Sequence, residues 1–190
     1  MNLVEHDNHM KKKLCIFTLG HSTRPIEDFL QLLKHYNITE LVDIRTIPKS
    51  RHNPQFNGPE LAHALRNHHI GYRHQKNLGG LRHASPHSIN TAWENASFRG
   101  FADYMQTAEF ADGLQELIKI AQEKTVAIMC AEAVPWRCHR SLIGDALLAH
   151  GIEVEDIFSI TSSKPHTLTP WALVHGTSVT YPANTENTHV

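Results

Sequence analysis

Residues Val126 to Gly144 read V-A-I-M-C-A-E-A-V-P-W-R-C-H-R-S-L-I-G, and this stretch is the strongest guide to the fold. It opens on Val126-Ala127-Ile128-Met129, an apolar run that suits a buried strand and is too short for a helix of usual length. After Pro135, apolar residues recur at the spacing of one helical face, at Leu142, Ile143, Ala146 and Leu147. The stretch therefore predicts a strand, a loop and a helix.

The start of the chain repeats this order of elements. Residues 14–19 form a β-type run, a helix with one apolar face follows from Pro25, and residues 41–45 form a second β-type run. A strand, a helix and a further strand in succession are typical of parallel pairing. We therefore expect an α/β fold of three layers, with a mostly parallel central sheet and helices on both faces.

The rest of the chain predicts further elements of the same kind and one long loop. Helices are expected after Pro59 and over 101–105 and 110–121, with strands over 70–74 and 154–160. Residues 81–100 show no clean period and predict a long loop with room for a short helix. The domain prediction is a flexible N-terminus over 1–13, a single α/β domain over 14–172, and a partly disordered C-terminal tail over 173–190.

The composition narrows the class of protein. The 190 residues are 41% hydrophobic and suffice for one domain with a real core. The chain has 18 Lys and Arg residues and 19 Asp and Glu residues, so its net charge does not indicate a nucleic-acid or membrane partner. Local charged patches could still bind one. The three cysteines, with no secretory segment and no apolar stretch of membrane-spanning length, predict free thiols in a reducing cytoplasm.

The loop between the predicted strand and helix is the best candidate site. In an open parallel sheet, ligands bind at the carboxyl ends of the strands, and the next helix adds free N–H groups and a positive dipole end there. This loop holds two thiols, a carboxylate, an imidazole and guanidinium groups: Cys130, Glu132, Arg137, Cys138, His139 and Arg140.

Two interpretations of Cys130 stay open. At a strand end, near Arg137, Arg140 and a helix N-terminus, its thiol suits a nucleophile with a lowered pKa, whereas a buried apolar cysteine is equally usual in a strand. Cys138 and His139 lie on the predicted apolar helix face, which favours a packed thiol and a half-buried imidazole. Seven residues separate the two cysteines, more than the roughly two to four of structural zinc sites, so we predict a metal-free site.

Two further strand ends supply candidate ligand-binding residues. His21 and Ser22 follow the first strand, in a turn that also suits ordinary N-cap chemistry. Asp43 and Arg45 lie in the second strand run, and the loop beyond it carries Arg51. Because a carboxylate among apolar residues needs a partner, we expect Asp43 to pair with an arginine, Arg137 or Arg140. We also expect the loops after all three strands to converge on one pocket that contains His21, Asp43 and Cys130.

Several of these segments together resemble a known family. They are T-L-G-H-S-T-R (18–24), L-V-D-I-R-T-I-P-K-S-R (41–51), N-P-Q-F-N (53–57), L-G-G (78–80), F-R-G-F-A-D-Y-M (98–105) and M-C-A-E-A-V-P-W-R-C-H-R (129–140). They are similar to family 488 of the domains of unknown function (DUF488), over roughly residues 17–170. The resemblance implies a compact cytoplasmic α/β domain, but no activity. It marks as site residues His21, Ser22, Asp43, Arg45, Cys130, Glu132, Arg137, Cys138, His139 and Arg140.

Two hypotheses of function follow. The first is a hydrolase or transferase that acts on an anionic, phosphate-bearing substrate related to nucleotides or nucleic acid. Cys130 would be its nucleophile and His21 or Glu132 would handle protons, or acid–base chemistry alone would serve, with Arg45, Arg137 and Arg140 binding charge. The second is a regulatory module that binds a nucleotide or nucleic acid without chemistry. The sequence names no cofactor and no oligomeric state.

Overall fold

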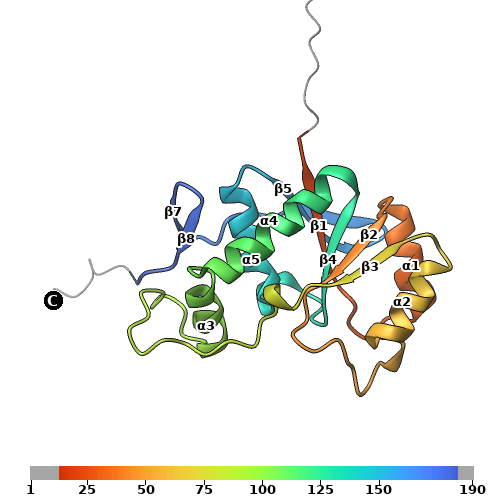
Figure 1. Cartoon of the computed structure of the whole chain (residues 1–190), viewed down its shortest axis with the longest axis horizontal. Helices are drawn as coiled ribbons and strands as arrows, with labels where there is room; N and C mark the ends of the chain where they lie inside the picture. Colours follow the sequence, from red (N-terminus) through yellow and green to blue (C-terminus); the bar gives the residue numbers. More distant parts are fainter. Residues whose placement is uncertain (1–12, 184–190) are drawn as a thin grey trace, which may run out of the picture.

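A computed structural model describes residues 13–183. The predicted flexible N-terminus, apart from Lys13, and the last seven residues of the predicted tail lie outside this range. Within it, the prediction of an α/β fold with a mostly parallel central sheet is confirmed (Figure 1).

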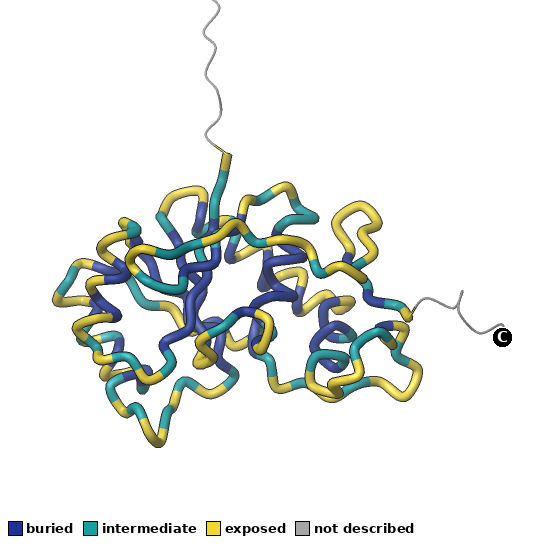
Figure 2. The backbone as a smooth tube through the Cα atoms, turned by 180° about the vertical axis from the view of Figure 1, so that it is seen from behind, coloured by how far each residue is buried: buried dark blue, intermediate teal, exposed yellow. Residues whose placement is uncertain are grey.

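The sheet has six strands in the spatial order β3-β2-β4-β1-β5-β6, and only β6 runs antiparallel. The bounds are β1 (Cys15–Gly20), β2 (Glu40–Asp43), β3 (Gly71–His74), β4 (Val126–Cys130), β5 (Glu153–Ser159) and β6 (Ser162–Pro165). Every residue of β2 and β4 is buried, as expected for central strands covered on both faces. These central strands form the inner part of the molecule in Figure 2.

Helices cover both faces and make two separate cores. One core lies under α1 (Ile26–His35) and α2 (Gly58–Arg66), around Phe29, Leu33 and Leu61. The other lies under α3 (Ala96–Tyr104), α4 (Ala108–Glu123) and α5 (Arg140–Ala149), around Phe101 and Leu142. Figure 1 shows α1 and α2 on one side of the strands and α3 to α5 on the other. Short 3₁₀ turns complete the chain as η1 (Pro54–Phe56), η2 (Lys76–Leu78) and η3 (Pro135–Arg137).

The long loop predicted after residue 80 is real, although α3 begins inside the predicted range, at Ala96. Asp103 of α3 holds the loop in place, because its carboxylate accepts hydrogen bonds from the Ser85 N–H, the Ser88 hydroxyl and the Asn90 amide. A local network therefore orders a segment that no hydrophobic period could reveal.

The packed domain extends further than the predicted boundary at residue 172. The segment after α5 and β5 adds a hairpin of β7 (Leu173–His175) and β8 (Ser178–Thr180). Val179 and Tyr181 are buried in the core under α3 to α5. The chain therefore packs against the domain at least as far as Tyr181.

Strands β1 and β4 are neighbours, yet the chain leaves them toward opposite faces of the sheet. β1 leads to α1 in one core, and β4 leads through η3 to α5 in the other. In open α/β sheets, ligands bind where neighbouring connections diverge in this way. The carboxyl ends of β1 and β4 are therefore the place to look for a site.

Candidate functional site

The loops after β1 and β4 meet at the same edge of the sheet, as the sequence predicted. The His21 N–H donates to the Cys130 carbonyl at 3.0 Å, and the Ser22 N–H donates to the Ala131 carbonyl at 2.9 Å. Gly20 permits this contact, because a Cβ at that position would overlap the Glu132 carbonyl. His21 and Cys130 are thus brought together through their backbones.

Asp43 pairs with Arg45, which corrects the expected partner, Arg137 or Arg140. The Arg45 Nε donates to Asp43 Oδ1 at 2.8 Å, and its Nη2 reaches Oδ2 at 2.5 Å. The strand ends at Asp43, so the chain can turn and direct the Arg45 side chain back at the carboxylate. Tyr72 of β3 donates its hydroxyl to Asp43 Oδ2 at 2.8 Å, and burial, with the Asp43 charge, raises the pKa of Tyr72.

His21 completes this group, which we call the ion-pair cluster (His21, Asp43, Arg45 and Tyr72). Its ring stacks on Phe56 with the centroids 4.3 Å apart, and Nδ1 lies 2.8 Å from the Ser22 carbonyl. Because a carbonyl only accepts, Nδ1 carries the proton, and Nε2, 3.4 Å from Arg45 Nη1, is the acceptor. Burial lowers the pKa of His21, so the ring is neutral and both nitrogens are engaged within the protein.

Cys130, Cys138 and His139 form a second group, the thiol cluster. Their two Sγ atoms and the His139 imidazole nitrogen lie within 4.8 Å of one another, and such a trio could hold a metal ion. The hydrogen bond from the Cys138 thiol holds the pKa of Cys130 well below its usual value, and the His139 ring and the Glu132 N–H add to the effect. The same bond, with burial, raises the pKa of Cys138. Of the two thiols, Cys130 therefore loses its proton more readily than Cys138.

His139 is oriented by its far nitrogen. Nε2 lies 3.0 Å from the Leu78 carbonyl, so Nε2 carries a proton and donates it. In the neutral ring, Nδ1 then has a free lone pair, and it faces Cys138 Sγ at 3.7 Å. Phe101 packs against the ring at 4.8 Å between centroids. Nδ1 can therefore accept a proton from the thiols or bind a metal ion.

The Arg140 side chain forms hydrogen bonds with the loop after Cys130. It is 1% exposed, and its guanidinium donates to the carbonyls of Glu132 and Ala133 at 2.5 and 3.0 Å. The backbone N–H of Arg140 donates to Cys138 Sγ at 3.5 Å. The side chain therefore shapes the loop after Cys130.

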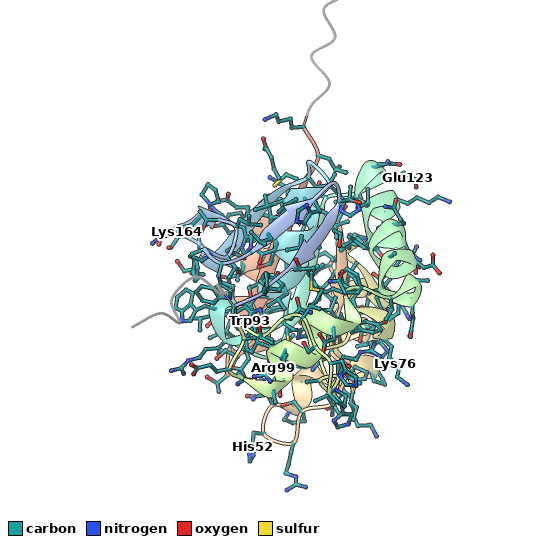
Figure 3. The ribbon with its side chains drawn as sticks, turned by 90° about the vertical axis from the view of Figure 1, so that its left-hand side faces the viewer. His52, Lys76, Trp93, Arg99, Glu123 and Lys164 are labelled. Carbon is teal, nitrogen blue, oxygen red and sulfur yellow. The ribbon has the colours of Figure 1, made fainter. Side chains whose placement is uncertain are left out.

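The remaining predicted site residues are more open to solvent. Glu132 and Arg137 are exposed in the loop after β4, and Arg51 is exposed in the loop after β2. Neighbouring His52 stands at the outer end of that loop in Figure 3. Ser22 is half-buried and has a left-handed backbone, with φ 50°.

The residues predicted to share one pocket form two clusters that pack against different cores, although the charge of Cys130 still acts on His21 and Arg45. Phe56, which stacks on His21, belongs to the core under α1 and α2, whereas Cys130 and Cys138 belong to the core under α3 to α5. Successive side chains of a strand alternate between faces, and the sequence did not show on which face each strand would end.

Sequence reasoning missed a third polar group, around His166. Its Nδ1 lies 2.9 Å from Asp156 Oδ2, and its Nε2 lies 3.1 Å from Asp145 Oδ1. Tyr181 donates its hydroxyl to Asp145 at 2.8 Å. The only signal in the sequence was that Asp145 and Asp156 lie in apolar segments. Buried carboxylates need partners, but the sequence did not show which residues these would be.

A cavity of about 350 Å³ lies between η3, β5, β6 and the segment 167–171. Trp93, Trp136 and Trp171 line it together with Phe158 and Lys164. The Trp93 indole N–H is buried without a hydrogen-bond partner among residues 13–183. Figure 3 shows Trp93 toward the middle of one face and Lys164 at its margin.

The comparisons with known proteins identify the family. The model of the family described as "Domain of unknown function DUF488" matches residues 25–147, and the chain belongs to this family. Neither the curated proteins nor the solved structures gave a match. Among the described helices, none has the length and apolar character needed to cross a membrane.

Proposed function

We propose that this DUF488 member is an enzyme, a hydrolase or transferase, in which the Cys130 thiolate attacks an anionic, phosphate-bearing substrate. The observation that carries the proposal is the convergence of hydrogen-bond donors on one strand-end sulfur. Cys138 Sγ and a His139 nitrogen lie within 4.8 Å of Cys130 Sγ, and hydrogen bonds from the Cys138 thiol and the Glu132 N–H lower the pKa of Cys130. A thiolate needs such donors to persist near pH 7, and purely structural cysteines do not.

The proposed chemistry uses the neighbours of Cys130. His139 Nδ1 accepts the thiol proton, because Nε2 is held by Leu78. The thiolate then bonds to the electrophilic atom of the substrate as the leaving group departs. The proton that His139 has accepted passes to that group, and Glu132, which is exposed two residues after Cys130, later activates water. His21 keeps the ends of β1 and β4 in register.

The preference for an anion rests on exposed charge at this edge of the sheet. Arg137 and Arg51 are exposed there, whereas Arg45 and Arg140 are engaged inside the protein. We therefore assign substrate charge to Arg137 and Arg51, and a shaping role to the two buried arginines. Cys130 and Cys138 lie close together without a disulfide, which fits a reducing cytoplasm.

The proposal is tested with chromogenic phosphate mono- and diesters and intact-mass spectrometry. We expect turnover, with a covalent adduct on Cys130 in rapidly quenched samples. Cys130→Ser should abolish both, while Cys15→Ser should leave both unchanged. Turnover that survives Cys130→Ser would refute the nucleophile, as would an adduct on another residue.

A second candidate function is a nucleotide-binding module without chemistry, and the cavity beside η3 favours it. Three tryptophans supply faces for a planar base, Lys164 supplies positive charge, and the Trp93 N–H has no partner among the described residues. Stacking of a base on an aromatic side chain is worth about 1–3 kcal/mol.

This alternative predicts quenching of tryptophan fluorescence by a mononucleotide. The quenching should be lost in Trp136→Ala and kept in Trp136→Phe. A shallow dependence on salt would indicate a small ligand, whereas a steep one would indicate contacts with many phosphates along a nucleic acid. Equal signals from both variants would exclude this cavity as the binding site.

A further inference from the structure

We infer that Cys130, Cys138 and His139 form a binding site for Zn²⁺, with a fourth coordination position left open. The two Sγ atoms and the imidazole nitrogen lie within 4.8 Å of one another. Two thiolates and an imidazole are ligands that zinc prefers. The inference departs from the metal-free site predicted from the sequence, because η3 folds the intervening loop back and brings the distant cysteines together.

The spacing of the ligand atoms is close to that of a tetrahedral zinc centre. Zinc–sulfur bonds of about 2.3 Å and zinc–nitrogen bonds of about 2.0–2.1 Å place neighbouring ligands about 3.6–3.8 Å apart. Cys138 Sγ and His139 Nδ1 are already 3.7 Å apart. Small rotations of the side chains would suffice for the third ligand atom, Cys130 Sγ.

The imidazole is held in the tautomer that a metal requires. Its Nε2–H donates to the Leu78 carbonyl at 3.0 Å, which leaves the Nδ1 lone pair directed at the sulfurs. A second hydrogen bond of this type is the usual partner of a zinc-bound histidine. Gly80 keeps the adjacent space open, because a Cβ there would overlap Nδ1.

The electrostatics of the cluster also favour a cation. Backbone N–H groups face both sulfurs, from Glu132 to Cys130 and from Arg140 to Cys138. Two buried thiolates side by side would repel each other, but two thiolates, one neutral imidazole and Zn²⁺ sum to zero charge. Metal binding therefore removes the last thiol proton at little electrostatic cost.

The three side chains leave a fourth coordination position without a protein ligand among the described residues. Within residues 13–183, the group of potential ligands comprises only these three side chains. Zinc sites with three protein ligands carry water or substrate in the fourth position. While zinc is bound, the Cys130 lone pair is used in coordination, so zinc occupancy and nucleophilic attack exclude each other. Zinc would then silence the proposed nucleophile reversibly.

The experiment titrates the reduced, chelator-stripped, full-length protein with Zn²⁺ against a chromogenic chelator, and with Co²⁺ as a spectroscopic probe. We expect one equivalent to bind, with the thiolate–cobalt charge-transfer band of a tetrahedral site. Cys130→Ser, Cys138→Ser and His139→Gln should each weaken binding at least tenfold, whereas Cys15→Ser should not. Unchanged affinity in both cysteine variants of the cluster would overturn the inference.

A second readout uses the wild-type protein and does not depend on the folding of variants. Stoichiometric Zn²⁺ should slow the alkylation of Cys130 by iodoacetamide at least tenfold, and a chelator should restore the rate. Absence of protection while Cys130 reacts would also overturn the inference. If Cys130 of the stripped protein is inert but zinc still binds through the cluster, the inference stands and the proposed nucleophile fails.

Discussion

The ion-pair cluster and the thiol cluster lie at the same edge of the sheet, yet their polar atoms are used differently. In the ion-pair cluster, both oxygens of Asp43 and both nitrogens of His21 have protein partners. In the thiol cluster, Nδ1 of His139 keeps a lone pair, and the donors around Cys130 stabilise its reactive form. The polar atoms of Asp43 and His21 are therefore already used within the protein. In the thiol cluster, the lone pair of His139 can still accept a proton or bind a metal ion.

The difference shows why buried polar residues at strand ends need not be functional. A saturated network specifies the local structure and resists change, because the removal of one member leaves a buried charge without a partner. A cluster with a spare lone pair and a stabilised anion tolerates substitution better, but loses its chemistry. Stability and reactivity should therefore respond in opposite ways when the two clusters are altered.

The largest effect should come from Asp43→Ala. Arg45, which is 6% exposed, would lose its carboxylate, and the loss of one partner from a buried pair costs about 3–5 kcal/mol. The free energy of unfolding in urea measures this. Lys13→Ala, which breaks the exposed pair with Glu153, is the control and should cost less than about 1 kcal/mol. A similarly small cost for Asp43→Ala would mean that the ion-pair cluster does not stabilise the fold.

The His166 group should behave like the ion-pair cluster and add a dependence on pH. Burial by itself lowers the pKa of His166, but Asp145 and Asp156 outweigh it and raise the pKa to about 9. Because the folded pKa exceeds the ordinary value of 6.5, this stabilisation is complete below about pH 6.5 and is lost as the pH rises through 9. At about 1.4 kcal/mol per pKa unit, the loss is on the order of a few kcal/mol.

Urea unfolding between pH 6 and pH 9.5 checks this prediction. His166→Gln should be less stable at pH 6 and should largely remove the decline seen for the wild type. Parallel curves for the two proteins would show that other groups cause the decline.

The thiol cluster should respond to Gly80→Ala mainly in reactivity. The new methyl group would displace the His139 ring, so the alkylation rate of Cys130 should fall about tenfold. Gly113→Ala is the matched control, because its Cβ meets the end of the Asn77 side chain, at 2.9 Å, instead. Equal alkylation rates in the two variants would show that His139 does not assist Cys130.

The smallest effect on stability should come from Arg137→Ala. The side chain is exposed, and such substitutions usually change the free energy of unfolding by less than about 0.5 kcal/mol. If Arg137 receives the substrate charge, KM for an anionic ester should rise while kcat changes little. An unchanged KM would remove Arg137 from the proposed binding surface.

The sequence was sufficient for the architecture, because apolar runs and turn residues report on local geometry. The strand from Val126, the helix from Arg140 and the parallel order of elements all follow from such patterns. The final hairpin was missed because β7 and β8 are three residues long and β7 has no buried residue, so no hydrophobic period marks them.

The sequence singled out residues that form the two clusters, but it did not show which of them would be partners. Cys130, Cys138 and His139 were recognised, yet their spacing argued against a common site, because the fold of the η3 loop cannot be read from spacing. Asp43 was expected to need an arginine, but the choice between Arg45 and distant arginines depends on where β2 ends. Contacts between residues that the fold brings together cannot be read from their spacing in the sequence.

The most direct test of the contrast between the clusters is the alkylation rate of each cysteine in the native, metal-free protein at pH 7, mapped by peptide mass spectrometry. Cys130 is 9% exposed and Cys138 is 3% exposed, so access alone differs little between them. We predict that Cys130 reacts at least tenfold faster than Cys138, because their shared hydrogen bond lowers the pKa of Cys130 and raises that of Cys138. Equal rates for the two cysteines, or a faster reaction of Cys138, would contradict this account.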